Sequence, residues 1–187
     1  MILQAILLSL VAGLTLRRYR LSWRHLGFRP MPGNAYWTAG AVAIGAQVLV
    51  ISYGLLVTAA GAHGLAPQQG LEGLFESRAV LPLVGVATVL TAPVAEETFF
   101  RGFVFAGLTR RLGVGGAALA SGLLFASFHV SSRDSVGLVI PFTVIGVAFA
   151  GLYRHTGSLW SSITAHFIFN LVSFIALTAI VQSGGST

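Results

Sequence analysis

The sequence contains no cysteine and no lysine, and charged residues of any kind are scarce. Of its 187 residues only 9% are charged, whereas soluble domains carry roughly 25%. Without cysteine the chain has neither a disulfide framework nor a thiolate metal site. Hydrophobic residues make up 55% of the chain. The low charge content, more than this hydrophobic fraction, predicts an integral membrane protein rather than a soluble domain.

The positive charge comes entirely from eleven arginines, and the formal net charge is +6. A nucleic-acid-binding protein would gather such residues on a solvated face or a tail. Here most of them lie in short breaks between apolar runs, at residues 17–29, 110–111 and 154. This distribution argues against a nucleic-acid partner. It is instead typical of the cytoplasmic loops of membrane proteins.

The hydropathy pattern predicts an all-α, polytopic transmembrane bundle of about six spans. Lipid offers no partner to an open backbone, so each run is expected to be helical. The runs are continuously apolar and lack the alternation of β-barrel strands. In the fourth run Ala118, Gly122 and Ala126 recur every fourth residue, which allows a close approach between helices. The six runs cover residues 1–16, 35–60, 79–109, 113–131, 136–153 and 158–182.

A few ionisable or strongly polar side chains lie inside these runs, where a charge costs on the order of 2.5–3.5 kcal/mol. Only five residues are acidic, yet Glu96 and Glu97 both fall in the third run. His129 lies near the end of the fourth run, and His166 and Asn170 lie in the sixth. At about 1.5 Å per helical residue, Glu96, His129, His166 and Asn170 are roughly 12–24 Å from the same membrane face. They are therefore expected to reach one cavity within the membrane.

Helical spacing separates the two glutamates. Glu97 and Arg101 are four apart on one face, so they are expected to pair. Glu96 lies about 100° round the helix and lacks such a partner. A buried, unpaired carboxylate is a better proton acceptor than one in water, so Glu96 beside a neutral imidazole is a candidate to activate water. His166 and Asn170, also four apart, are candidate oxyanion donors, and the set suits amide hydrolysis.

Other proteolytic centres lack their sequence patterns in this chain. It contains no His-Glu-x-x-His, no Gly-x-Ser-x-Gly and only one aspartate, Asp134. A zinc site built from Glu96, His129 and His166 is chemically allowed, although nothing in the sequence requires a metal. Some of these residues could instead have a purely structural role. Glu97 and Arg101 could form a buried ion pair, and a single histidine could form a hydrogen bond between helices.

Three motifs resemble those of one peptidase family. Residues 96–101 (Glu-Glu-Thr-Phe-Phe-Arg) resemble the Glu-Glu-x-x-x-Arg motif of the CPBP family, the CAAX-protease and bacteriocin-processing intramembrane peptidases. Residues 125–129 (Phe-Ala-Ser-Phe-His) are similar to its Phe-x-x-x-His motif, and residues 166–170 (His-Phe-Ile-Phe-Asn) are similar to its His-x-x-x-Asn motif. All three occur in order within about residues 79–175, which makes the resemblance specific.

The resemblance implies a catalytic transmembrane core in residues 79–182, after two N-terminal transmembrane helices in 1–78 and before a tail at 183–187. Family members are often described as metalloproteases, so zinc enters as a candidate cofactor. The eukaryotic members remove the last three residues of prenylated CAAX proteins. The resemblance therefore implies a protein or peptide substrate that is prenylated or membrane-bound.

The resemblance also assigns roles to individual residues. It implies that Glu96 and His129 activate water and that His166 and Asn170 form the oxyanion hole. It further implies that Glu97, Arg101 and Phe125 are supporting residues of the site.

The sequence thus favours an intramembrane endopeptidase that resides in the cell membrane. In a bacterium this would be the inner membrane. Two alternatives stay open. The first is a non-catalytic immunity or scaffolding protein that retains the protease fold. The second is a proton- or ion-coupled transporter that uses Glu96 as its carrier, although the inverted repeats of such transporters are not visible.

Overall fold

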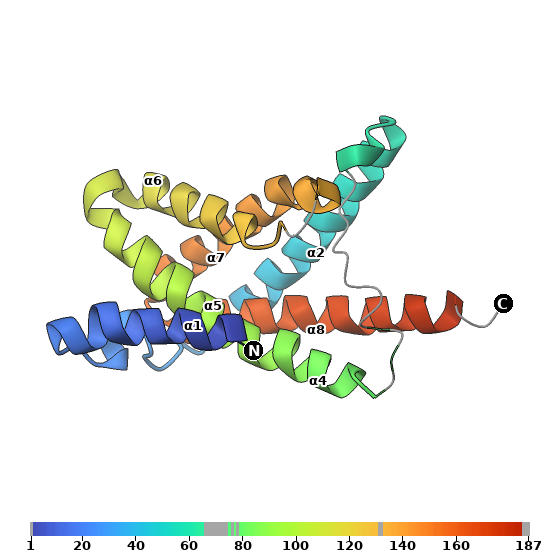
Figure 1. Cartoon of the computed structure of the whole chain (residues 1–187). Helices are drawn as coiled ribbons and strands as arrows, with labels where there is room; N and C mark the ends of the chain where they lie inside the picture. Colours follow the sequence, from blue (N-terminus) through green and yellow to red (C-terminus); the bar gives the residue numbers. More distant parts are fainter. Residues whose placement is uncertain (1, 66–74, 76, 78, 131–132, 185–187) are drawn as a thin grey trace.

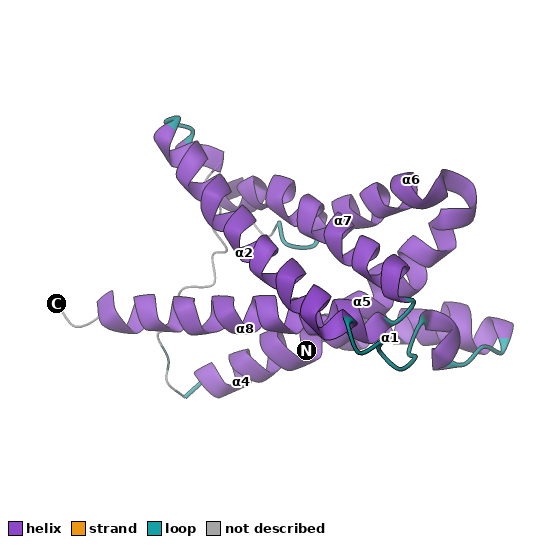
Figure 2. Cartoon of the chain, turned by 180° about the vertical axis from the view of Figure 1, so that it is seen from behind, coloured by secondary structure: helices purple, strands orange, loops and turns teal. Residues whose placement is uncertain are grey.

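The computed structural model describes residues 2–65, 75, 77, 79–130 and 133–184, and most of these residues are helical. Figures 1 and 2 show long helices that cross one another, with no strand in this part of the chain. Residues 185–187 of the predicted tail lie outside the described part. The α-helices are α1 (Ile2–Val11), α2 (Ala35–Ala59), α4 (Leu81–Gly85), α5 (Ala92–Glu97), α6 (Ala106–Ser127), α7 (Val139–Thr156) and α8 (Leu159–Gly184).

Four helical stretches in the described residues are long and apolar enough to cross a membrane: Ala35–Ala59, Leu81–Ser127, Val136–Thr156 and Leu159–Ser183. Apolar side chains on α2, such as Ile44, Val48 and Leu55, are exposed as lipid-facing residues are. The predicted all-α membrane bundle is therefore confirmed, and the protein is a multi-pass integral membrane protein.

The number of spans was predicted as about six, and four stretches among the described residues are long enough to cross a membrane by themselves. The first predicted run forms the apolar helix Ile2–Arg17, which is shorter than a membrane crossing of about 17–25 residues. The third and fourth runs follow each other within Leu81–Ser127 as two helices that meet at a kink at Gly113. Gly113 interrupts this stretch with φ 67° and ψ 175°, a conformation open to glycine because it lacks a Cβ atom. The chain turns there (Figure 1), and the part of α6 after Gly113 is too short to span a bilayer by itself.

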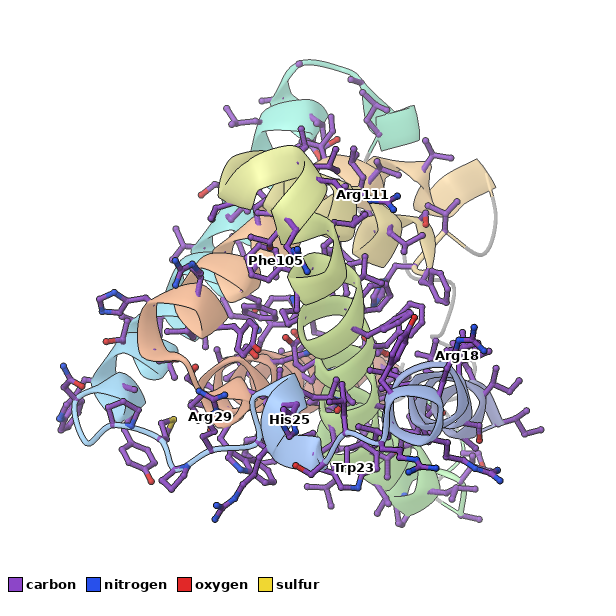
Figure 3. The ribbon with its side chains drawn as sticks, turned by 90° about the vertical axis from the view of Figure 1, so that its left-hand side faces the viewer. Arg18, Trp23, His25, Arg29, Phe105 and Arg111 are labelled. Atoms are coloured by element: carbon purple, nitrogen blue, oxygen red, sulfur yellow. The ribbon has the colours of Figure 1, made fainter. Side chains whose placement is uncertain are left out.

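The arginine-rich loops gather at one end of the molecule. Figure 3 looks onto this end, where Arg18 and Arg29, on either side of the loop between α1 and α2, and Arg111, beside the turn at Gly113, are all exposed. The same loop is anchored to the start of α8, because the Leu159 backbone N–H donates to the carbonyl of Gly27 at 2.7 Å. The N-terminal region is therefore bound to the helical core and does not hang free of it.

Helices α6 and α7 approach each other most closely at two glycines. A Cβ atom placed on Gly146 would lie 2.6 Å from the Cα of Gly122, and one placed on Gly122 would lie 2.7 Å from the carbonyl oxygen of Thr143. Neither position tolerates a side chain without a backbone shift. This contact uses the small-residue spacing of α6, as the sequence pattern indicates.

We expect Gly146→Ala to destabilise the protein by about 1–3 kcal/mol, because the added methyl group overpacks a backbone contact. Thermal unfolding in detergent micelles measures this as a lowered Tm. Gly151→Ala on the same helix is the matched control, since nothing lies within 4 Å of its Cβ position. There alanine should be neutral or stabilising, because it favours the helix over glycine. Equal Tm values for the two variants would contradict the glycine contact.

Candidate active site

Glu96 and Glu97 lie in α5, a short α-helix between two π-helical segments, Val86–Thr91 and Thr98–Phe105. Pro93, in the first turn of α5, has no N–H to donate. The wider π-helical turn before it accommodates this missing hydrogen bond. π-helical turns of this kind often occur at functional sites. The local sequence thus places two adjacent carboxyl groups at an irregular point of a membrane helix.

Glu97 is the centre of a fully buried polar cluster. Its Oε1 accepts a hydrogen bond from Arg101 Nη1 at 2.7 Å and a second from His166 Nδ1 at 2.9 Å. Arg101 is also fully buried, and its Nη2 donates to the carbonyl of Gly146 at 3.1 Å. The guanidinium carbon lies 4.7 Å from the ring centroid of Phe125, a cation–π contact that supports the buried charge. The structure therefore contains the predicted pair and extends it to α7 and α8.

The contact between Glu97 and His166 determines which nitrogen of that ring faces the second glutamate. Because Nδ1 donates to Glu97, Nε2 faces the other way and lies 3.9 Å from Glu96 Oε2. That distance is too long for a direct hydrogen bond. The sequence had left Glu96 without a neighbouring partner, and His166 is the partner that the tertiary structure supplies. With Nδ1 used in this way, Nε2 can donate only when the ring is protonated.

His129 follows the C-terminal end of α6 and is fixed by its own helix. Its Nδ1 donates to the carbonyl of Phe125 at 2.9 Å, which leaves Nε2 as the acceptor nitrogen of the neutral ring. The rings of Phe125 and Phe142 each lie 4.6 Å from the imidazole, centroid to centroid. Phe125 therefore supports this histidine with both its carbonyl and its ring.

Asn170 is positioned by a hydrogen bond to a residue of the third apolar run. Its Nδ2 donates to the carbonyl of Thr88 at 2.8 Å, within the π-helical segment that precedes Pro93. One amide hydrogen is thereby used, and the second stays available to a ligand. The irregular backbone around α5 thus positions side chains on α8 as well as its own.

All four predicted site residues, Glu96, His129, His166 and Asn170, line one cavity of about 570 Å³. No described residue makes a hydrogen bond to Glu96 Oε2, which is buried in its wall. The remainder of the wall is mainly apolar, and most of it comes from α6, α7 and α8. Its apolar members include Phe125, Phe142, Ile145, Phe149, Phe169, Phe174, Leu177 and Ile180. The cavity thus combines a carboxylate, two imidazoles and an amide with a long apolar surface.

The structure also bears on the zinc alternative. Among the residues described, no three His, Cys, Asp or Glu side chains are arranged to hold a metal ion. Both Nδ1 atoms donate to other groups, in His129 to the Phe125 carbonyl and in His166 to Glu97, and a metal-bound histidine commonly donates its other ring N–H in this way. Glu96, His129 and His166 are not arranged as a three-ligand site in this structure, and zinc as a cofactor stays a prediction.

Several polar residues of the cavity were missed by the sequence reasoning. They are Gln4, Gln47, Thr88 and Ser173. The two glutamines could have been predicted from the sequence, because each is a strongly polar residue in a mainly apolar helix. The role of Thr88 could not have been predicted in this way, because Thr88 contacts Asn170 through its backbone carbonyl and not through its side chain.

We expect removal of Arg101 alone to be strongly destabilising, by about 3–5 kcal/mol, because Arg101→Met leaves the Glu97 carboxylate buried and uncompensated. The double variant Glu97→Leu with Arg101→Met should be more stable than Arg101→Met alone, since it removes both charges. Denaturant or thermal unfolding in detergent gives the comparison. If the double variant lost as much stability as the two single variants combined, the two residues would not interact as a buried pair.

Comparison with known proteins places this site within a family. A family model described as Type II CAAX prenyl endopeptidase Rce1-like matches residues 78–172, about half of the chain. Fold and site define a multi-pass membrane protein with a buried carboxylate–histidine cavity. The chain belongs to the Rce1-like family of type II CAAX prenyl endopeptidases, which confirms the resemblance to CPBP proteins.

One curated relative extends this comparison. The chain is 26% identical over 102 residues to the Bacillus subtilis (strain 168) protein named "Putative membrane peptidase YdiL". The alignment covers 54% of this chain and 40% of that relative, so the chain matches less than half of the relative's length. No solved structure matches the chain significantly.

Proposed function

We propose that this protein is an intramembrane endopeptidase that hydrolyses a peptide bond in or near the membrane with water activated by Glu96 and His129. The observation that carries the proposal is the convergence of Glu96, His129, His166 and Asn170 on one cavity of about 570 Å³. Polar groups of this kind are costly within a membrane, and they mark functional sites. Membership of a peptidase family supports the same reaction class.

Glu96 is the general base of the proposed reaction. Its unpaired Oε2 takes a proton from a water molecule, and His129 Nε2 orients that water as a second acceptor. The water oxygen attacks the carbonyl carbon of the scissile bond, and the carbonyl π electrons move onto its oxygen. Collapse of the tetrahedral intermediate breaks the C–N bond. Glu96 then returns its proton to the leaving amine, so the base is regenerated.

The developing oxyanion needs donors on the opposite side of the carbonyl. Asn170 has one free amide hydrogen, and His166 provides Nε2–H when its ring is protonated. Glu97 and Arg101 are positioning residues, since they orient the His166 ring without reaching the substrate.

The apolar wall points to the class of substrate. Beyond the polar residues, the cavity continues along α8 past Phe174, Leu177 and Ile180. Such a surface suits a peptide whose end is buried in the membrane, either by a prenyl group or by apolar side chains. CAAX-type processing is the specific form of the proposal, and it draws its support from the family description.

We expect Glu96→Gln and His129→Ala to lower the cleavage rate by at least about 100-fold, which is the smaller end of the effect of a general base. The assay uses purified protein in liposomes with a farnesylated CAAX peptide and its unprenylated counterpart. His155→Ala, an exposed histidine at the end of α7, is the matched control and should cleave at the parent rate.

Undiminished cleavage by both site variants would defeat the proposed mechanism. The non-catalytic alternative makes a different prediction: Glu96→Gln, which keeps the shape of the side chain, would leave the cellular phenotype of the protein intact. Peptide selectivity in the same assay separates CAAX-type processing from general intramembrane cleavage, because only the former depends on the farnesyl group.

We expect cleavage to survive metal removal, since the proposed water activation needs only side chains. The protein is incubated with EDTA or 1,10-phenanthroline and then freed of the chelator before the peptide assay, and bound metal is measured by mass spectrometry. Loss of activity that returns specifically with added Zn²⁺ would contradict this expectation and would require the three candidate ligands to rearrange.

A further inference from the structure

The first helix contributes a polar residue to the cavity. Gln4, Leu7 and Val11 lie on one stripe of α1, at positions i, i+3 and i+7, and Leu7 and Val11 are buried. This stripe packs against α5, the helix that carries Glu96. In Figures 1 and 2 the start of α1 lies beside the segment where α4 leads into α5. Gln4 is partly buried and continues this stripe toward the start of the helix.

The side-chain oxygen of Gln4 is buried, and no described residue donates a hydrogen bond to it. Buried carbonyl oxygens are nearly always paired, with the protein, with water or with a ligand. Gln4 lines the same cavity as Glu96, whose Oε2 is likewise unpaired among the described residues. Two acceptors from α1 and α5 thus face a space that a ligand can enter.

Gln47, on α2, adds a third acceptor to this cavity. Its side-chain nitrogen donates to the carbonyl of Phe169 at 2.7 Å and to Ser173 Oγ at 2.9 Å. Both amide hydrogens are therefore used, and the carbonyl oxygen is the group that remains for a ligand. Gln47 is also part of the cavity wall.

A wall with three acceptor oxygens selects for a ligand with hydrogen-bond donors. A prenyl chain or an acyl chain has none. A peptide backbone presents an N–H at every residue except proline. The acceptors therefore match the peptide part of a substrate, while the aromatic surface along α8 matches its apolar part.

We propose that Gln4 is a substrate-binding residue whose side-chain carbonyl accepts a hydrogen bond from a backbone N–H of the bound peptide, close to Glu96. The inference rests on the proposed peptidase function and adds a contact to it. Gln4 lies outside residues 78–172, which the family model matches. The N-terminal helix thereby completes a site whose reacting groups belong to the family core.

The test measures peptide binding separately from cleavage. Fluorescein-labelled farnesylated CAAX peptide is titrated against full-length protein in nanodiscs, in the non-cleaving Glu96→Gln background. Gln4→Met keeps the length of the side chain and removes the acceptor. We expect it to raise Kd about tenfold, as loss of one buried hydrogen bond does.

The matched control is Thr15→Val in the same apolar helix. Thr15 also has a buried oxygen that accepts or donates no hydrogen bond among the described residues, but it does not line the cavity. It should leave Kd unchanged. A rise in Kd for both variants would point to a general effect on the first helix and would overturn the specific role of Gln4.

A second measurement identifies the bond itself. A series of peptides, each with one backbone nitrogen methylated, is titrated against the same two proteins. One position should weaken binding to the Gln4 protein and have no effect on binding to Gln4→Met. If every position weakens binding equally in both proteins, Gln4 accepts no peptide N–H, and a water molecule pairs its oxygen instead.

The two proposals fail in different ways. Cleavage by the protein with Glu96 intact, together with unchanged binding by Gln4→Met, overturns only the inference about Gln4. Gln4-dependent binding without cleavage of any peptide overturns the peptidase proposal and leaves a peptide-binding cavity.

Discussion

The buried contact of Glu97 with Arg101 and His166 is the interaction on which the rest of the site depends. A lone carboxylate in this position would be prohibitively costly, and the arginine makes its burial tolerable. Because the same oxygen accepts from His166, one charge pair links α5 to α8 and, through Gly146, to α7. Gly146, whose carbonyl accepts from Arg101, also lies where α7 closely approaches Gly122 of α6.

The two neighbouring glutamates show how one helix can serve structure and chemistry together. Glu97 is fully paired at one oxygen and closed off from the cavity. Glu96, one residue earlier, turns toward the cavity with an oxygen that no described residue pairs. The π-helical segments on either side of α5 set these directions. A rigidly held carboxylate beside one that accepts no hydrogen bond from any described residue is the arrangement on which the proposed catalytic role of Glu96 rests.

Beyond the family core, the N-terminal helices shape the cavity. Gln4 on α1 and Gln47 on α2 face the same space as the residues of the family motifs. The loop between these helices is tied to the start of α8 by the bond between Gly27 and Leu159. The residues of the family motifs lie on other elements than these two glutamines.

By itself the sequence determined the membrane class, the helical nature of every apolar run, the pairing of Glu97 with Arg101 and the small residues at the contact of α6 with α7. These follow from composition and from spacing along a single helix, which are local properties. Only the tertiary structure decided that His166 faces both glutamates, that Asn170 binds the carbonyl of Thr88, and that Gln4 reaches the cavity. Such features depend on how helices distant in sequence cross, and hydropathy and periodicity carry no information on that geometry.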